Sequence, residues 1–310
     1  MISYTTHAGV KKIASVSVIL ILFSGMLVVH PAFAHNFVQN PDADLIAKIQ
    51  EFKIESKMIA NNISNNTLAQ WHISKSQEYW GSNESATLSQ KDSSLANQIS
   101  TSIGDLYSLV QSQNANSTVA NQKADAINQL LDQAESEEIS TSSQGNATIQ
   151  ALALVGVITE VLKDYGDAIG SNVDLTNMDN MNASSTSGSM QGMSGMSMPK
   201  TPIVNMAAYQ SAQALTEVSQ TMLGNLQTIA PSDASTYLSK AGTALGALKQ
   251  KIDAQGSGMD VMTIVHMQCH PNLIAAFNIE AVPEFPMPIL LVIMSFGGIV
   301  IMSRVFSKNR

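Results

Sequence analysis

The sequence predicts an all-α protein in which about seven helices form an antiparallel bundle. Three observations support this fold class. Apolar residues recur at intervals of three and four through most of the chain, no segment shows the alternating pattern of a half-buried strand, and short polar connections separate the periodic segments. Two apolar segments at the ends and one stretch rich in Ser, Gly and Met do not follow this pattern, and each predicts something other than a bundle helix.

Residues 1–34 have the organisation of a secretory signal peptide. Two lysines precede an apolar region, and Ala32 and Ala34 frame a small-x-small cleavage site. Cleavage after Ala34 would make His35 the first residue, so that its free amine and its imidazole could bind copper together where another histidine approaches; otherwise the position of His35 is accidental. The alternative is an uncleaved membrane anchor, because the apolar region is nearly long enough to span a bilayer.

Residues 35–170 predict a bundle of five helices. The first helix begins behind Pro41, because proline is favoured in the first turn of a helix. The other four helices are expected near residues 66–80, 88–109, 117–138 and 147–169. The apolar faces are clearest in the first and third segments, which contribute Leu45, Ile49, Phe52 and Ile59, and Leu88, Leu95, Ile99, Leu106 and Leu109.

Residues 171–200 interrupt the helical pattern. Ser, Gly, Asn and Met dominate this stretch, which predicts a flexible linker that cannot bury a core. Residues 201–254 then predict a helical hairpin, whose second helix starts at Pro231-Ser232-Asp233. Two helices alone cannot form a stable core, so we expect the hairpin to pack onto the first five.

The linker also carries a chemical signal, because Met190, Met193, Met196 and Met198 are closely spaced. Thioethers are soft, neutral ligands that favour Cu(I). The stretch resembles the Met-rich copper-binding segments of extracytoplasmic copper-handling proteins. The alternative is a low-complexity spacer in which methionine has no chemical role.

Residues 255–281 form a Met/His/Cys segment that is expected next to the membrane. Met262, His266, Cys269 and His270 follow spacings of three and four, which would place them on one face of a helix. Thioether, imidazole and thiolate donors together suit Cu(I) or Zn(II). The alternative is a helix that packs its Met and Val side chains and satisfies its histidines locally. Cys269 is the only cysteine, so no disulfide can form within the chain.

Residues 282–310 predict a membrane-directed tail. Val282-Pro283-Glu284-Phe285-Pro286 precedes an uncharged stretch that is long enough for a transmembrane helix, and a basic end completes the segment. The segment resembles the PEFG-CTERM sorting signal of surface proteins of ammonia-oxidising archaea, with Pro286 where that family usually has Gly. This resemblance implies cleavage near Pro283 to Phe285 by an archaeosortase-like processing enzyme and transfer to a surface anchor.

Charge and motif content exclude several functions. The chain has 16 Lys and Arg against 24 Asp and Glu, a formal net charge of -8, so no nucleic-acid partner is expected. No Ser/His/Asp order, phosphate-binding loop or Gly-rich cofactor motif occurs, so we predict that the protein is not an enzyme. Glycosylation sequons, which predict a glycoprotein, occur at Asn62, Asn65, Asn83, Asn116, Asn146 and Asn182.

His72 lies on the apolar side of its helix and is expected to be a hydrogen-bonded core histidine. An exported helical domain of the imelysin type, in which a helix histidine serves iron or haem, is the alternative for this residue. The leading interpretation of the whole chain is an extracytoplasmic, surface-anchored helical protein that binds or buffers copper. The alternative is a structural or interaction glycoprotein of the cell envelope without metal chemistry.

Overall fold

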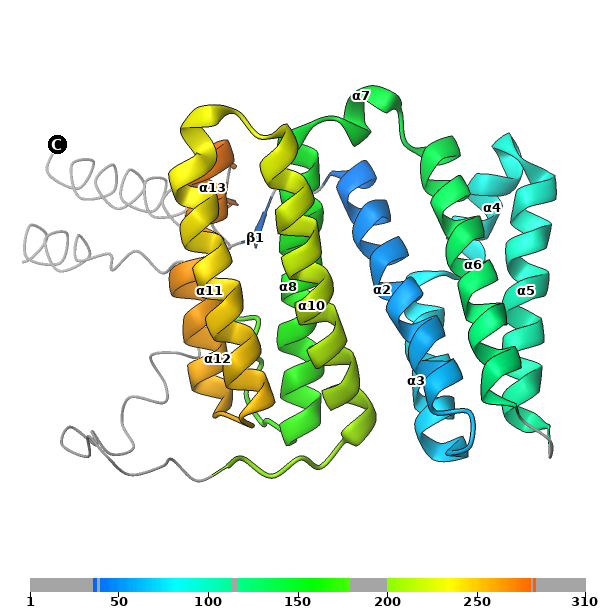
Figure 1. Cartoon of the computed structure of the whole chain (residues 1–310). Coiled ribbons are helices and arrows are strands. Elements are labelled where there is room, and N and C mark those ends of the chain that lie inside the picture. Colours follow the sequence, from blue (N-terminus) through cyan, green and yellow to red (C-terminus); the bar gives the residue numbers. More distant parts are fainter. Residues whose placement is uncertain (1–35, 38–39, 113–115, 179–199, 280, 283–310) are drawn as a thin grey trace, which may run out of the picture.

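The computed structural model describes residues 36–37, 40–112, 116–178, 200–279 and 281–282. This part of the chain is helical apart from one short strand pair, which confirms the all-α fold class. In Figure 1 the helices stand roughly upright and side by side. The first half contains α2 (Pro41–Asn61), α3 (Asn66–Tyr79), α4 (Ser82–Lys91), α5 (Ser93–Gln111), α6 (Ser117–Glu138), α7 (Thr141–Gln144) and α8 (Ala147–Ile169).

The second half contains α10 (Met206–Ile229), a 3-10 turn η2 (Ser232–Ala234), α11 (Ser235–Asp253), α12 (Gly258–Ile264), a π-helical turn η3 (Val265–Cys269) and α13 (His270–Phe277). The strands β1 (Asn36–Phe37) and β2 (Ala281–Val282) pair antiparallel, with Asn36 opposite Val282. The described residues thus hold about ten helices, more than the seven that the sequence predicted.

The expected helix over 88–109 is in fact two helices, α4 and α5. Asp92 has extended backbone angles, φ -136° and ψ 92°, and its carboxylate accepts a hydrogen bond from the Leu95 amide at 2.9 Å. An aspartate in this position caps a new helix, so the chain turns although the apolar spacing continues. Leu88 and Leu95 are nevertheless buried in the same core, because the turn keeps their faces together.

Asparagine side chains begin five of the helices. Asn40 accepts a hydrogen bond from the Ala43 amide at 3.0 Å, and α3, α6, α8 and α10 are capped in the same way. Three of these caps, Asn65, Asn116 and Asn146, are also glycosylation sequons. Helix capping therefore gives a structural reason for asparagine at these three positions.

Buried apolar residues form two large cores. The N-terminal core is built by α2 to α6 and contains Ile49, Phe52, Leu88, Ile99 and Leu131 among others. The C-terminal core is built mainly by α8, α10, α11 and the α12–η3–α13 segment. α2 contacts both α6 and α8, and it contributes Ala47 to the C-terminal core. The two cores thus meet along α2 and α8.

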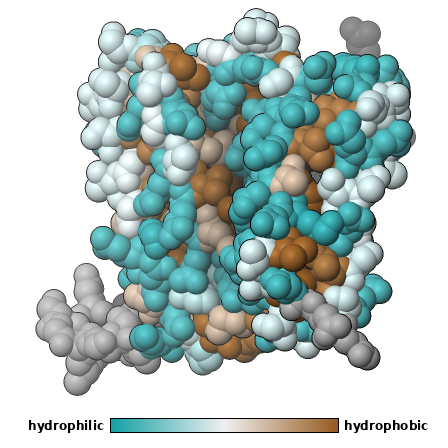
Figure 2. Space-filling model, turned by 45° about the vertical axis from the view of Figure 1, so that its right-hand side comes forward, coloured by the Kyte–Doolittle hydropathy of each residue, from teal (hydrophilic) through white to brown (hydrophobic). Residues whose placement is uncertain are grey.

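The molecular surface is consistent with helices that bury one apolar face and expose a polar one. Figure 2 shows a mostly hydrophilic face on which hydrophobic residues gather in a vertical hollow near the middle and in patches at the right. Within the described residues no helix is both long and apolar enough to cross a bilayer. The expected signal peptide, residues 1–34, and the expected transmembrane stretch, residues 287–303, lie outside the described residues.

The structure describes the first eight residues of the expected linker, 171–178. Leu175 is only 3% exposed and belongs to the C-terminal core. It fits there because Gly166 and Gly258 present no side chain: a Cβ atom on these glycines would lie 3.6 Å and 3.2 Å from Leu175 atoms. Residues 171–178 thus pack against the bundle, and residues 179–199 lie outside the described part of the chain.

Candidate functional site

The predicted Met/His/Cys cluster lies on the α12–η3–α13 segment, which packs against α11 and α8. Its members are all buried: Met262 and Cys269 are 0% exposed, His270 2% and His266 3%. The amide of His270 donates to the carbonyl of Val265, which makes the turn between them π-helical. One extra residue in a turn rotates the subsequent residues by about 100° relative to an α-helix, so the angle between His270 and the residues before the turn differs from the one that simple spacing gives.

Two imidazoles form the centre of this cluster. The rings of His266 and His270 meet edge to face with their centroids 5.4 Å apart. Nε2 of His266 also lies 3.0 Å from the carbonyl oxygen of Leu175, which ties the cluster to the residues after α8. Burial raises the pKa of the Cys269 thiol to about 12, so this thiol is protonated at neutral pH.

Of the predicted donors, the two imidazoles are the pair that the structure brings into ring contact. No three His, Cys, Asp or Glu side chains converge as a metal centre would require, as far as the described residues go. A metal here would therefore need the Met262 thioether beside the two imidazoles. The other predicted ligands, His35 and the four linker residues Met190, Met193, Met196 and Met198, lie outside the described residues.

A buried ion network between α3 and α8 was not predicted from the sequence. Lys75 Nζ lies 2.6 Å from a Glu160 oxygen and 3.4 Å from an Asp164 oxygen, and Tyr79 donates to Glu160 at 2.9 Å. Burial alone would lower the pKa of Lys75, but Asp164 and Glu160 raise it above its ordinary value. Burial likewise would raise the pKa of Glu160, yet Lys163 and Lys75 hold it below its usual range. The network therefore keeps its lysine and Glu160 charged inside the protein.

His72 is a hydrogen-bonded core histidine, as expected. Its Nδ1 lies 2.7 Å from a Glu55 oxygen, and its Nε2 lies 3.2 Å from the side-chain oxygen of Gln210. The Ser211 hydroxyl is 3.4 Å from the same Nδ1 but donates to Glu55 at 2.6 Å. His72, Glu55 and Ser211 are all 0% exposed, so no substrate can reach the serine. These residues join α2, α3 and α10 and have a structural role.

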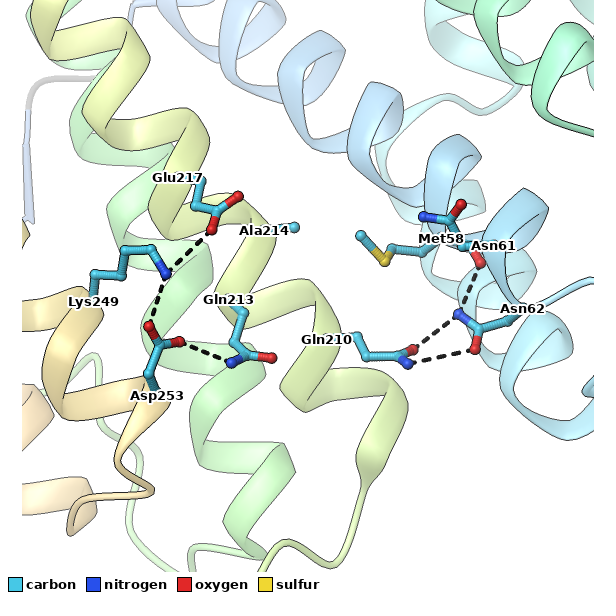
Figure 3. A pocket seen from close by; sticks show the side chains of 9 residues that line it. All are labelled: Met58, Asn61, Asn62, Gln210, Gln213, Ala214, Glu217, Lys249 and Asp253. Atoms are coloured by element: carbon cyan, nitrogen blue, oxygen red, sulfur yellow. Dashed lines mark hydrogen bonds and ion pairs between the residues drawn. The ribbon is translucent and has the colours of Figure 1, made fainter.

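A pocket of 330 Å³ opens where α2 ends beside α10 and α11. In Figure 3 its polar side chains form two separate groups. Asn62 and Gln210 pair across α2 and α10, with 2.9 Å between the Asn62 amide nitrogen and the Gln210 oxygen. Asp253 accepts from Gln213 at 2.8 Å and from Lys249 at 2.7 Å. These polar groups form hydrogen bonds and ion pairs with one another. The pocket is therefore a contact region between helices whose polar groups already have partners.

Comparison with known proteins returns no relative for this chain: no family model, no curated protein and no solved structure matches it.

Proposed function

We propose that the chain is an exported helical protein, attached to the cell surface through its C-terminal segment, that binds Cu(I) outside the cell. The observation that carries the copper proposal is the buried imidazole pair of His266 and His270, 5.4 Å apart between ring centroids, on a π-helical turn next to Met262. π-helical turns are rare and occur frequently at functional sites.

The chemistry of the cluster favours a soft, monovalent metal. Two imidazoles and a thioether are neutral donors, and Cu(I) accepts both types. The cluster is enclosed by apolar side chains of the C-terminal core, including Val261, Val265 and Leu273. An apolar shell limits the access of solvent to a bound metal. The Cys269 thiol would join the ligands only by releasing its proton, so it is the least favoured of the four donors.

We expect a competition titration of the purified chain with a Cu(I) chelator to detect binding at neutral pH. Replacing His266 and His270 with Gln should lower the Cu(I) affinity of one class of site about tenfold or more. Losing a metal ligand, or a group that orients one, commonly has an effect of this size. Replacing Met190, Met193, Met196 and Met198 with Leu should remove a separate class. Met222→Leu, which alters a thioether packed elsewhere on the C-terminal core, is the matched control.

A titration that neither set of substitutions changes would contradict the copper proposal. Circular dichroism of each variant shows whether the helices are retained, so that a lost site can be told from a lost fold. If the helices persist and the titration is unchanged, the structural or interaction role in the cell envelope becomes the better proposal.

The proposed surface attachment can be tested separately, through the mass of the native protein. If the N-terminal segment is a cleaved signal peptide and the tail a sorting signal, mature protein should begin at His35 and lack residues beyond about 286, the end of the sorting motif. It should still fractionate with the envelope. Intact-mass measurement of native material tests this, and recovery of the complete 287–310 segment would show that the tail is retained.

A further inference from the structure

A groove of 830 Å³ lies between α2, α3 and α8, away from the Met/His/Cys cluster. One part of its lining is apolar and comes from Pro41, Ala43 and Ala47 of α2 together with Leu152 and Val155 of α8. The other part is polar and contains Glu51, Glu78, Tyr79, Glu160 and Lys163. Ligand sites for small molecules typically have volumes of about 300–1,000 Å³ and this combination of an apolar wall with a few polar groups.

Glu51 is the exceptional residue of the groove. Its side chain lines the groove, and the residue is only 6% exposed. No hydrogen bond or ion pair joins it to any other residue in the described part of the chain. By contrast, Glu160 beside it accepts from Lys75, Lys163 and Tyr79 at 2.6, 2.9 and 2.9 Å. The Glu51 oxygens are not among the enclosed unsatisfied atoms of the described residues, so they face the groove, where a ligand could supply the donor that the protein does not.

The charges around the groove favour a cation once Glu51 is ionised, because the other acids that line it are paired with lysines. Four acidic residues line it, Asp44, Glu51, Glu78 and Glu160, against two lysines, Lys48 and Lys163. Both lysines are engaged, because Lys48 pairs with Asp44 and Glu84 at 3.1 Å each and Lys163 pairs with Glu160. A hard metal ion would need several converging oxygen ligands, and no group of three acids or histidines among the described residues provides them.

We propose that this groove binds a small organic amine, whose ammonium group donates to Glu51 while its hydrocarbon part packs on Ala43, Ala47 and Val155. The ammonium would replace the partner that Glu51 lacks, and the hydrocarbon part would cover the apolar wall. This site is independent of copper binding, because none of its residues belongs to the α12–η3–α13 segment.

The affinity should depend on pH in a defined direction. Burial, and then the charge of Glu160, raises the pKa of Glu51 to about 8. The neighbouring titratable groups are Asp44 and Lys48 on α2, Lys75, Glu78 and the neutral Tyr79 on α3, and Glu160, Lys163 and Asp164 on α8. Near neutral pH the empty groove therefore holds a protonated Glu51, and binding of an ammonium releases this proton. Affinity should rise as pH increases through 8.

The test is a calorimetric titration of the full chain with hexylamine at pH 6.5 and pH 8.0. Hexanol, which has the same hydrocarbon chain but no charge, is the control ligand. Hexylamine should bind about fifteenfold more tightly at pH 8.0 than at pH 6.5, because the ionised fraction of Glu51 increases by about that factor. Hexanol binding should not change with pH. Glu51→Gln should weaken hexylamine binding at least about tenfold at pH 8.0 and abolish its pH dependence.

Glu137→Gln is the control variant, because Glu137 is an exposed carboxylate of α6 that does not line the groove. It should bind hexylamine like the unchanged chain. Glu51→Gln breaks no bond within the described structure, so its helix content and melting temperature should be maintained or increased. Absence of hexylamine binding at pH 8.0, or equal binding by Glu51→Gln, would overturn the proposal.

Discussion

Replacing Lys75 with methionine is expected to lower the free energy of unfolding by about 3–5 kcal/mol, the usual cost of removing one partner from a buried ion pair. Lys75 is 8% exposed, and it is the cation that both Glu160 and Asp164 share. Methionine keeps most of the side-chain length but leaves two carboxyl groups in the interior with less compensation. Urea unfolding followed by circular dichroism measures the loss.

The control is Lys163→Met on α8. The Lys163 side chain is 55% exposed, and its ion pair with Glu160 at 2.9 Å is partly solvated. Removing an ion pair of this kind costs only about 0–1 kcal/mol. Burial raises the pKa of Asp164, so the destabilisation in Lys75→Met should be smaller at pH 5, where a native carboxyl can keep its proton, than at pH 8. Equal stabilities of the two variants would show that the network is not buried as described.

Phe52→Ala should reduce the free energy of unfolding by about 3–5 kcal/mol, because a truncated buried aromatic residue leaves a cavity. Phe52 is 1% exposed and is the largest fully buried side chain in the N-terminal core. It lies on α2, the helix that contacts both α6 and α8. The same unfolding measurement applies.

Two control variants separate the cavity effect from a general effect of mutation. Phe52→Leu retains most of the buried volume and should cost clearly less, about 1.5 kcal/mol or below. Tyr237→Ala removes an aromatic side chain that is 39% exposed, and it should change stability by no more than about 0.5 kcal/mol. A loss below about 1 kcal/mol for Phe52→Ala would contradict a close-packed core around α2.

Most helices could be predicted because their signals are local. The expected segments 117–138 and 147–169 coincide with α6 and α8, where apolar periodicity and an asparagine cap agree. The break at Asp92 also has a local signal, because aspartate is a common N-cap. The apolar spacing continues across this residue, however, and it predicted one helix where the structure has two.

The buried charges could not be predicted because their partners come from distant parts of the chain. Glu160 and Asp164 stand four residues apart in a helix whose other residues are mostly apolar, which is a signal in itself. Their cation, Lys75, belongs to α3, so only the packing of α3 against this part of α8 shows that the charges are compensated. The same reasoning applies to Glu51, whose place in a groove depends on three helices.

The candidate copper cluster was predicted by composition and only partly by geometry. Spacings of three and four identified Met262, His266, Cys269 and His270, because an α-helix repeats at that interval. The π-helical turn between Val265 and His270 alters the angular relation of these residues, and no local sequence rule indicates such a turn. The burial of all four also depends on tertiary packing, in particular on Leu175 from the segment after α8.

The pairing of β1 with β2 has a consequence for how the molecule would sit on a surface. Because Asn36 lies opposite Val282, the polypeptide enters and leaves the helical body at one point. An attachment made beyond residue 282 would therefore hold the helical body at β2, beside the strand through which the chain enters it.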